Sequence, residues 1–261
     1  MIPSDTSAKG REWAEIVRSA EEARKFPFSP VSRAQVERYL DPQPDTPWVL
    51  EYAFHLLGDI RGKTVVDLGC GKGENLIPLA ERGAKVIGID LSPDLIQLAK
   101  KRIEIAAAAA TVRIGSAYET GFESESVDVI FCVALIHHLE VGRVHDEMWR
   151  ILKKGGFVVL SEPIRFSRLY EGLRRLFPSA RGVSEFEGPL TRAEFNSITE
   201  RFTIEGERYF RLPFVPLVER FMVRSTSSFS HKVSARMLRL APALEHFATK
   251  VVVKLRKHPS D

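Results

Sequence analysis

The stretch Val65-Val-Asp-Leu-Gly-Cys-Gly-Lys-Gly-Glu-Asn75 decides the fold of this 261-residue chain. It begins as an apolar run fit for a buried strand, which ends in Asp67, and Gly69, Gly71 and Gly73 then alternate before a helical pattern begins. Glycine has no Cβ atom, so the backbone can turn sharply and approach a ligand closely. The order of strand, glycine loop and helix therefore predicts a ligand-binding turn at the carboxyl end of a sheet strand.

Short apolar runs recur along the chain and alternate with helical patterns. We expect strands at 63–68, 84–90, 111–114, 127–133 and 157–160, and helices at about 74–82, 92–108 and 140–152. Repeated strand–helix units predict parallel strands joined by right-handed crossovers, with helices on both faces of the sheet. The runs are nearly continuous in Val, Ile and Leu, as in strands that are covered on both faces. The predicted fold class is α/β, with a doubly wound, mostly parallel sheet.

The rest of the chain is expected to extend this core within one domain over residues 1–261. The expected parts are an N-terminal helical cap at 1–47, a ligand-binding core at 48–163, and insertions with closing strands at 164–261. Thr191 and Glu194 have the spacing of a capping box, which predicts a short helix. Two closing strands are expected at 202–210 and 248–255, with a helical insertion between them.

Composition and charge exclude several classes of protein. The formal net charge of +4 is mild but uneven, since eleven Lys and Arg face two acids between residues 208 and 257. Cys70 and Cys132 stand far apart in apolar runs, without metal-ligand neighbours at a recognisable spacing, which argues against a zinc site and predicts reduced, buried thiols. The first residues lack the pattern of a signal peptide, and no apolar run approaches the ~20 residues that span a bilayer. We therefore expect a cytoplasmic protein.

A dinucleotide site is the simplest alternative for the glycine loop, because such loops also bind pyrophosphate. The dinucleotide spacing G-x-G-x-x-G, however, needs a small residue at position 74, where Glu74 stands. Asp67 is poorly placed beside a phosphate but suits a ligand that carries an ammonium and a sulfonium, as S-adenosyl-L-methionine does. Asp90 ends the second strand and can accept hydrogen bonds from both ribose hydroxyls. Its alternative role is a helix N-terminal acid, but Ser92 and Pro93 already supply the N-cap and first residue of the next helix, which leaves Asp90 free for a ligand.

These motifs resemble those of class I S-adenosylmethionine-dependent methyltransferases of the small-molecule type, the ubiquinone-biosynthesis-like or methyltransferase type 11 group. The resemblance covers about residues 50–165 and includes the segments 122–139 and 150–157. It implies a seven-stranded Rossmann-like sheet with a helical cap and a helical insertion before the last strand. It also implies S-adenosyl-L-methionine as cofactor, S-adenosyl-L-homocysteine as product, and no metal. The implied cofactor-binding residues are Asp67, Gly69, Cys70, Gly71, Gly73, Asn75, Asp90, Leu91, Ser116, Ala117 and Val133.

The segment after the third strand departs from the family pattern. Many relatives carry Gly-Asp-Ala there, and the acid meets the adenine amine. This chain has Gly115-Ser116-Ala117 instead, so the Ser116 hydroxyl is expected to hydrogen-bond adenine. The preceding helix ends in Ala106 to Ala110, without the Gly or Asn that commonly ends a helix.

His137 and His138 are the candidate catalytic residues. Methyl transfer from a sulfonium is an in-line displacement that depends on alignment, and a base is needed only if the acceptor carries a proton. Both histidines lie where the fourth strand opens into the site, and the resemblance favours His138 as the base. A packed loop histidine is the equal alternative for His138, while His137 is expected to be structural or solvent-facing. Glu162 is interpreted as a strand-end carboxylate in preference to a substrate contact.

The cap and the later insertions form the acceptor pocket in the resembling family. Here they offer the aromatic residues Trp13, Phe26, Phe28, Tyr39, Trp48, Tyr52, Phe166, Tyr170, Phe177, Phe186, Phe210, Phe214 and Phe221. Most are expected to be core, but together they favour a small apolar or aromatic acceptor. The basic segments 164–177 and 213–247 are interpreted as helices packed on the body, with peripheral membrane contact and a lipid-like acceptor as the alternative.

Two other functions compete with a small-molecule methyltransferase. An RNA methyltransferase is suggested by the basic C-terminal part. We find no Asn/Asp-Pro-Pro-aromatic motif, no Pro-Cys nucleophile and no appended RNA-binding module, so RNA is disfavoured as a partner and DNA is not expected. The alternative outside enzymes is a non-catalytic, adenosylmethionine-binding regulatory protein. The sequence leaves the methylated atom and the oligomeric state open.

Overall fold

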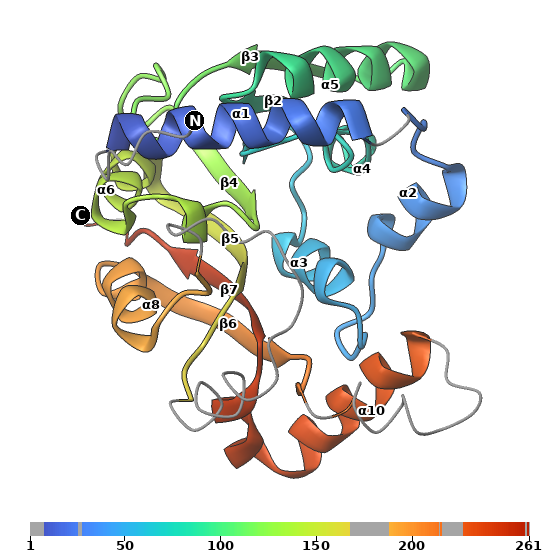
Figure 1. Ribbon diagram of the computed structural model, residues 1–261, viewed down its shortest axis with the longest axis vertical. Helices are drawn as coiled ribbons and strands as arrows, with labels where there is room; N and C mark the ends of the chain where they lie inside the picture. Colours follow the sequence, from blue (N-terminus) through green and yellow to red (C-terminus); the bar gives the residue numbers. More distant parts are fainter. Residues whose placement is uncertain are drawn as a thin grey trace.

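The computed structural model describes residues 8–25, 28–167, 188–213, 215, 227–258 and 260, which are arranged around one seven-stranded sheet (Figure 1). The strand order is β3-β2-β1-β4-β5-β7-β6. The strands are β1 (Thr64–Leu68), β2 (Lys85–Asp90), β3 (Ala110–Ile114), β4 (Val127–Val133), β5 (Leu152–Pro163), β6 (Thr203–Phe210) and β7 (Lys250–Arg256). Strands β1 to β5 are parallel, whereas β7 is antiparallel to both β5 and β6. The predicted doubly wound, mostly parallel sheet is confirmed.

Helices cover both faces of the sheet. They are α1 (Ala8–Lys25), α2 (Arg33–Leu40), α3 (Val49–Leu57), α4 (Leu76–Glu81), α5 (Pro93–Ala106), α6 (Val141–Ile151), α8 (Arg192–Thr199) and α10 (Ser227–Leu240), with 3₁₀ turns η1 (Ile136–His138) and η2 (Pro242–Phe247). The predicted capping box opens α8, because Thr191 Oγ1 accepts from the backbone N–H of Glu194 at 3.2 Å. The predicted helical insertion before the last strand is present as α10 and η2.

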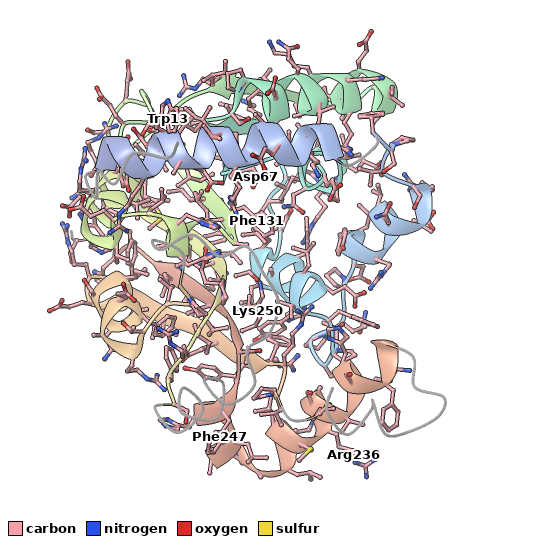
Figure 2. The ribbon with its side chains drawn as sticks, viewed as in Figure 1. Trp13, Asp67, Phe131, Arg236, Phe247 and Lys250 are labelled. Atoms are coloured by element: carbon pink, nitrogen blue, oxygen red, sulfur yellow. The ribbon has the colours of Figure 1, made fainter. Side chains whose placement is uncertain are left out.

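The core consists of two apolar layers, one on each face of the sheet. Side chains alternate along a strand, so β4 sends Ile130 toward α6 and Phe131 toward α3. Phe131 is fully buried, and its ring centroid lies 5.0 Å from that of Phe54 in α3 (Figure 2). Burial on both faces accounts for the continuous apolar runs that mark these strands in the sequence.

The strand order places the expected ligand site at one edge of the sheet. The chain runs from β1 outward to β2 and β3, and then returns to add β4 on the other side of β1. Ligands in doubly wound sheets bind at the carboxyl ends of the strands where the order reverses. The glycine loop, Asp90, Ser116 and His137 all follow strand ends at this edge.

Strand β5 begins earlier than the sequence indicates, at Leu152 in place of Phe157. Leu152 pairs with Val127 ahead of a bulge in the β4–β5 ladder. The backbone N–H of Lys257 then donates to the carbonyl oxygen of Gly156. Val127 and Lys257 are distant in sequence from the start of β5. The local sequence at residues 152–156 therefore does not predict that this segment joins the sheet.

The end of α5 leads to a stability prediction. Ala107 adopts φ +47°, in the left-handed region, which costs a residue with a Cβ atom about 1–2 kcal/mol. We expect Ala107→Gly to raise the free energy of unfolding by about 0.5–1 kcal/mol, after allowing for the greater freedom of glycine in the unfolded chain. Urea unfolding measures this, and the matched Ala106→Gly change at the last residue of the helix should lower stability by about 0.5 kcal/mol. A less stable Ala107→Gly protein would contradict the prediction.

Candidate functional site

A cavity of about 390 Å³ lies at the carboxyl ends of β1, β2 and β4. This size falls within the usual range of small-molecule sites, about 300–1,000 Å³. The cavity is lined by Glu15, Ser19, Gly69, Cys70, Gly71, Lys72, Glu74, Asn75, Asp90, Leu95, Val133, Ala134, Leu135 and His138. The glycine loop, the end of β2, the turn after β4 and the helix α1 therefore meet around one space.

Two glycines of the loop have different roles. Gly71 has φ +51° and lines the cavity, and a Cβ atom added there would meet nothing within 4 Å. Gly73 has φ +79°, and a Cβ atom there would lie 2.8 Å from the Cβ of Ala99. Gly73 therefore allows α5 to pack against the loop and does not line the cavity. Gly71 leaves its backbone open to a ligand.

Asp90 connects the glycine loop to the start of α5. Its Oδ2 accepts from the backbone N–H of Gly71 and its Oδ1 from that of Ser92, both at 2.9 Å. Ser92 caps the helix as expected, but it does not leave Asp90 free, which corrects the sequence interpretation. Each carboxylate oxygen has two lone pairs, so Asp90 can still accept from a ribose. Burial raises the pKa of Asp90, and the two backbone donors oppose that shift.

Asp67 is a buried carboxyl group near the end of β1 (labelled in Figure 2), with 1% of its surface exposed. Among the described residues, no group hydrogen-bonds to its Oδ2. Burial, reinforced by repulsion from Asp90, raises the pKa of Asp67 to about 8. Asp90 and Glu15 line the cavity, so it disfavours a pyrophosphate and suits a ligand that carries positive charge.

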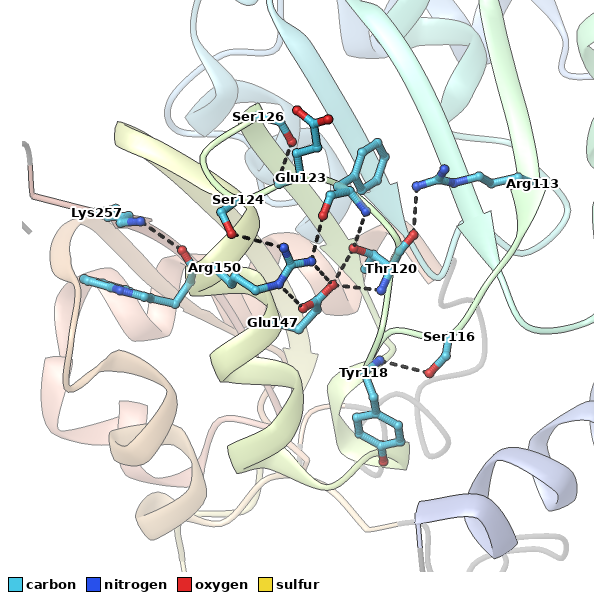
Figure 3. A network of polar contacts seen from close by, with 12 residues as sticks. Arg113, Ser116, Tyr118, Thr120, Glu123, Ser124, Ser126, Glu147, Arg150 and Lys257 are labelled. Atoms are coloured by element: carbon cyan, nitrogen blue, oxygen red, sulfur yellow. Dashed lines mark hydrogen bonds and ion pairs between the residues drawn. The ribbon is translucent and has the colours of Figure 1, made fainter.

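The loop that carries Ser116 is held on α6 by a network of hydrogen bonds around the buried Glu147 (Figure 3). Glu147 accepts from the backbone N–H of Thr120 at 2.8 Å and from its hydroxyl at 2.5 Å. Arg150 donates to both oxygens of Glu147 at 2.8 Å and to the carbonyl oxygen of Phe122. The backbone N–H of Tyr118 donates to the Ser116 hydroxyl at 3.0 Å. This network holds Ser116 at the end of β3.

Helix α1 contributes site residues that the sequence did not indicate. Glu15 and Ser19 line the cavity, and the Ser116 hydroxyl donates to the carboxylate of Glu12. His138 lies near the same helix, with its Nδ1 3.8 Å from an oxygen of Glu15. The sequence spacing of positions 12, 15 and 19 puts them on one helical face. The spacing does not show which other element of the fold this face contacts.

The other sequence-predicted cofactor residues divide between the cavity and its surroundings. Asn75 lines the cavity at the N-cap of α4, and its side chain makes no capping hydrogen bond. Cys70 also lines it, and burial raises the pKa of its thiol. The lining residues do not include Asp67, Gly73, Leu91, Ser116 and Ala117.

His137 and Glu162 form a hydrogen-bonded pair beside the cavity. His137 Nδ1 lies 2.8 Å from Oε2 of Glu162, which is 1% exposed. The other oxygen of Glu162 accepts from the backbone N–H groups of Leu135 and Ile136, both at 2.9 Å. A proton on Nδ1 satisfies the carboxylate and leaves the lone pair on Nε2. Glu162 is therefore a hydrogen-bond partner of His137 as well as a carboxylate at the end of β5. His137 is not solvent-facing, because only 14% of its side chain is exposed.

His137 lines a second cavity, of about 220 Å³. It is lined by Arg11, Ile136, His137, Leu139, Val141, Arg165, Gly188, Pro189, Leu190, Thr191 and Glu194. Arg11 and Glu15 are one helical turn apart, so α1 runs along both cavities. His138 lines the first cavity and His137 the second, and their ring centroids are 3.9 Å apart.

The aromatic residues of the cap and insertions do not line either cavity, as far as the described residues extend. Tyr39 stacks on Phe54, and Phe166 packs between Phe195 and Tyr209. Tyr39 and Phe166 therefore stabilise the body of the protein, whereas Trp13 is exposed. Phe26, Tyr170, Phe177, Phe186, Phe214 and Phe221 lie outside the described residues.

The basic segments are described only in part, because residues 168–187, 214 and 216–226 lie outside the described chain. Within the described ranges, no helix is both long enough and apolar enough to cross a membrane. The same ranges contain no group of three or more His, Cys, Asp and Glu that could hold a metal ion.

Residues 66–160 match the family model described as "Methyltransferase domain". The chain is 27% identical over 224 residues to the ubiquinone biosynthesis O-methyltransferase of Alkalilimnicola ehrlichii, and the match covers 76% of this chain and 86% of that protein. It is 25% identical over 199 residues to the protein of that name from Nitrosomonas europaea, covering 73% and 84%. Residues 66–160, which match the family model, contain the loop glycines, Asp90, Ser116 and the histidine pair.

The fold is similar to the crystal structure of geranyl diphosphate C-methyltransferase from Streptomyces coelicolor A3(2), in complex with Mg2+, geranyl diphosphate and S-adenosyl-L-homocysteine. The TM-score is 0.62 at 17% identity, and the alignment covers 98% of this chain and 99% of that one. At this identity the similarity concerns the fold.

Proposed function

Because this chain is a class I S-adenosylmethionine-dependent methyltransferase, we propose that it methylates a hydroxyl oxygen of a small, apolar or aromatic acceptor, with His137 as general base. The observation that carries the proposal is the 2.8 Å contact between His137 and the buried Glu162, next to the cofactor cavity. An oxygen acceptor agrees with the names of the two relatives described above.

The residues around the first cavity fit the cofactor. Bound S-adenosyl-L-methionine supplies a methyl group on a positively charged sulfonium. In this proposal, Asp90 accepts from the ribose hydroxyls and the backbone from Gly69 to Gly71 holds the methionine part. Asp67 and Glu15 favour the positive charges, and the unsatisfied Oδ2 of Asp67 is an observation that such a ligand explains. Cys70, Gly73, Asn75, Leu91, Ser116, Ala117 and Val133 remain in the proposal as parts of the cofactor's surroundings.

The acceptor occupies the second cavity in this proposal. Ile136, Leu139 and Val141 supply the apolar part of its lining, and His137 supplies the proton acceptor. The lining also contains the charged Arg11, Arg165 and Glu194, which suit the polar substituents of the acceptor. Nε2 of His137 would take the hydroxyl proton as the acceptor oxygen bonds to the methyl carbon, and S-adenosyl-L-homocysteine would leave as the carbon–sulfur bond breaks. Glu162 would hold the ring and stabilise the imidazolium. The 3₁₀ turn η1 carries both histidines, with His138 at the first cavity and His137 at the second. This supports a base beside both the acceptor and the cofactor.

Calorimetric titration with S-adenosyl-L-methionine and S-adenosyl-L-homocysteine tests the cofactor part. We expect micromolar binding by the wild-type protein, and a loss of about 1–3 kcal/mol in Asp90→Ala, which removes the ribose acceptor. Asp94→Ala, an exposed acid in the first turn of the same helix, is the matched control and should bind normally. A wild-type protein that does not bind would refute the assignment of the glycine loop.

Acceptor screening tests the reaction itself. We expect mass spectrometry to show methylation of phenols or catechols by the wild-type protein. Cofactor binding with no methylation of any acceptor would favour the regulatory alternative, and salt-sensitive binding of RNA would favour the RNA methyltransferase.

A further inference from the structure

We propose that Glu12, positioned by Ser116, accepts the hydrogen bond of the 6-amino group of the cofactor's adenine. This assignment rests on the proposed function, since it concerns a bound adenosyl cofactor. It concerns a residue of α1, 104 positions away in sequence from the serine that it contacts.

The strand order sets the direction in which the cofactor lies. The glycine loop follows β1, Asp90 ends β2, and Ser116 follows β3, in the spatial order β3-β2-β1. A cofactor with its methionine part at the loop and its ribose at Asp90 therefore extends its base toward β3. Asp90 pairs with Ile114, and the backbone N–H of Gly115 donates to the carbonyl oxygen of Asp90 at 3.0 Å. Ser116 is thus in the strand-end position next to the ribose acceptor.

The hydrogen bonds of Ser116 determine what it can offer to the base. A serine hydroxyl has one proton, and that of Ser116 is donated to Glu12. Ser116 also accepts from the backbone N–H of Tyr118 at 3.0 Å. The adenine amino group is a donor and needs an acceptor. The carboxylate of Glu12 has a second oxygen and further lone pairs, so it is the stronger acceptor at this place.

Helix α1 brings Glu12 to the base end of the cavity. Glu15 and Ser19 line the cavity, and Glu12 lies one turn further along the same face, toward β3. The helix packs against α5, which begins just after Asp90. The clamp of Glu147 and Arg150 on the loop after Ser116 keeps the serine in place from the other side (Figure 3). Two independently held elements thus fix the position of the carboxylate.

The test compares two ligands and two proteins. The ligands are S-adenosyl-L-homocysteine and its purine analogue, in which hydrogen replaces the 6-amino group, and calorimetry gives each dissociation constant. We expect the wild-type protein to bind the analogue about 10- to 100-fold more weakly, the usual effect of losing a hydrogen bond to a charged group. In Glu12→Ala the two ligands should bind within about threefold of each other, because the acceptor of the amino group is gone.

The ratio of the two affinities separates this role from a structural one. If Glu12→Ala weakened both ligands equally and kept the wild-type ratio, Glu12 would only hold α1 in place and the proposal would be overturned. Glu12→Gln retains an amide oxygen and should keep part of the ratio, while Glu21→Ala, an exposed acid of the same helix, should keep all of it. If the wild-type protein bound neither ligand, the proposed function itself would fail, which is a distinguishable outcome.

Discussion

His137→Ala is expected to lower kcat by about 100- to 10,000-fold, the range that a positioned general base contributes. The reason is the contact between His137 and Glu162, which directs the Nε2 lone pair away from the carboxylate. Cofactor affinity should stay within about threefold of wild type, because His137 does not line the cofactor cavity. Steady-state kinetics with an acceptor from the screen and calorimetry with S-adenosyl-L-homocysteine measure the two effects.

Glu162→Gln distinguishes orientation of the base from bulk packing. The glutamine oxygen can still accept from the backbone of Leu135 and Ile136, but its NH₂ group then faces His137. That contact favours the tautomer with the proton on Nε2, which cannot accept the hydroxyl proton. We expect a loss in kcat close to that of His137→Ala with a folded protein and normal cofactor binding.

His138→Ala is the matched control for this pair. Its side chain lines the cofactor cavity, so the change should affect cofactor affinity more than kcat. The opposite pattern, with His137→Ala active and His138→Ala inactive, would return the role of base to His138, which the sequence favoured.

Asp67→Asn is expected to stabilise the cofactor-free protein strongly at alkaline pH. Burial raises the pKa of Asp67 from 3.8 to about 8, so between these values the folded protein holds a proton that the unfolded chain has released. Folding stability therefore falls as pH rises through this window and levels off above the folded pKa. At 1.36 kcal/mol per pKa unit, a shift from 3.8 to about 8 costs the wild-type protein about 5–6 kcal/mol above pH 8. Asparagine has no charge to bury and avoids this cost.

Urea unfolding at several pH values measures this difference. Wild type and Asp67→Asn should have similar stability near pH 4, and the variant should gain on wild type by about 1.4 kcal/mol per pH unit up to pH 8. Asp94→Asn, an exposed acid, should leave the wild-type pH dependence unchanged. Parallel curves for wild type and Asp67→Asn would show that Asp67 is ionised in the folded protein at neutral pH.

The same variant should lose cofactor affinity, although it is more stable. A cationic ligand favours the ionised form of Asp67, so wild-type affinity for S-adenosyl-L-methionine should rise with pH up to about 8. Asp67→Asn should bind about tenfold more weakly and lack this rise. A gain of stability with a loss of binding is expected for a functional group whose burial destabilises the folded protein.

Much of the fold and the cofactor side of the site could be predicted from local sequence. Apolar runs of strand length, helix caps such as Ser92 and Thr191, and alternating glycines are local signals, since each depends on neighbours within a few residues. The same signals identified Asp67 and Asp90. They did not show that Gly73 packs against Ala99, because that contact requires α5 to be in place.

The sequence by itself determined the α/β alternation, the glycine loop and the acids at the ends of β1 and β2, because adjacent residues encode these features. Only the tertiary structure decided which histidine has a carboxylate partner and what α1 covers. His137 meets Glu162 because β4 and β5 are neighbours with Val133 opposite Ser161, and Glu12 meets Ser116 because α1 packs across the edge of the sheet. Such pairs depend on how distant elements dock, which no local pattern specifies.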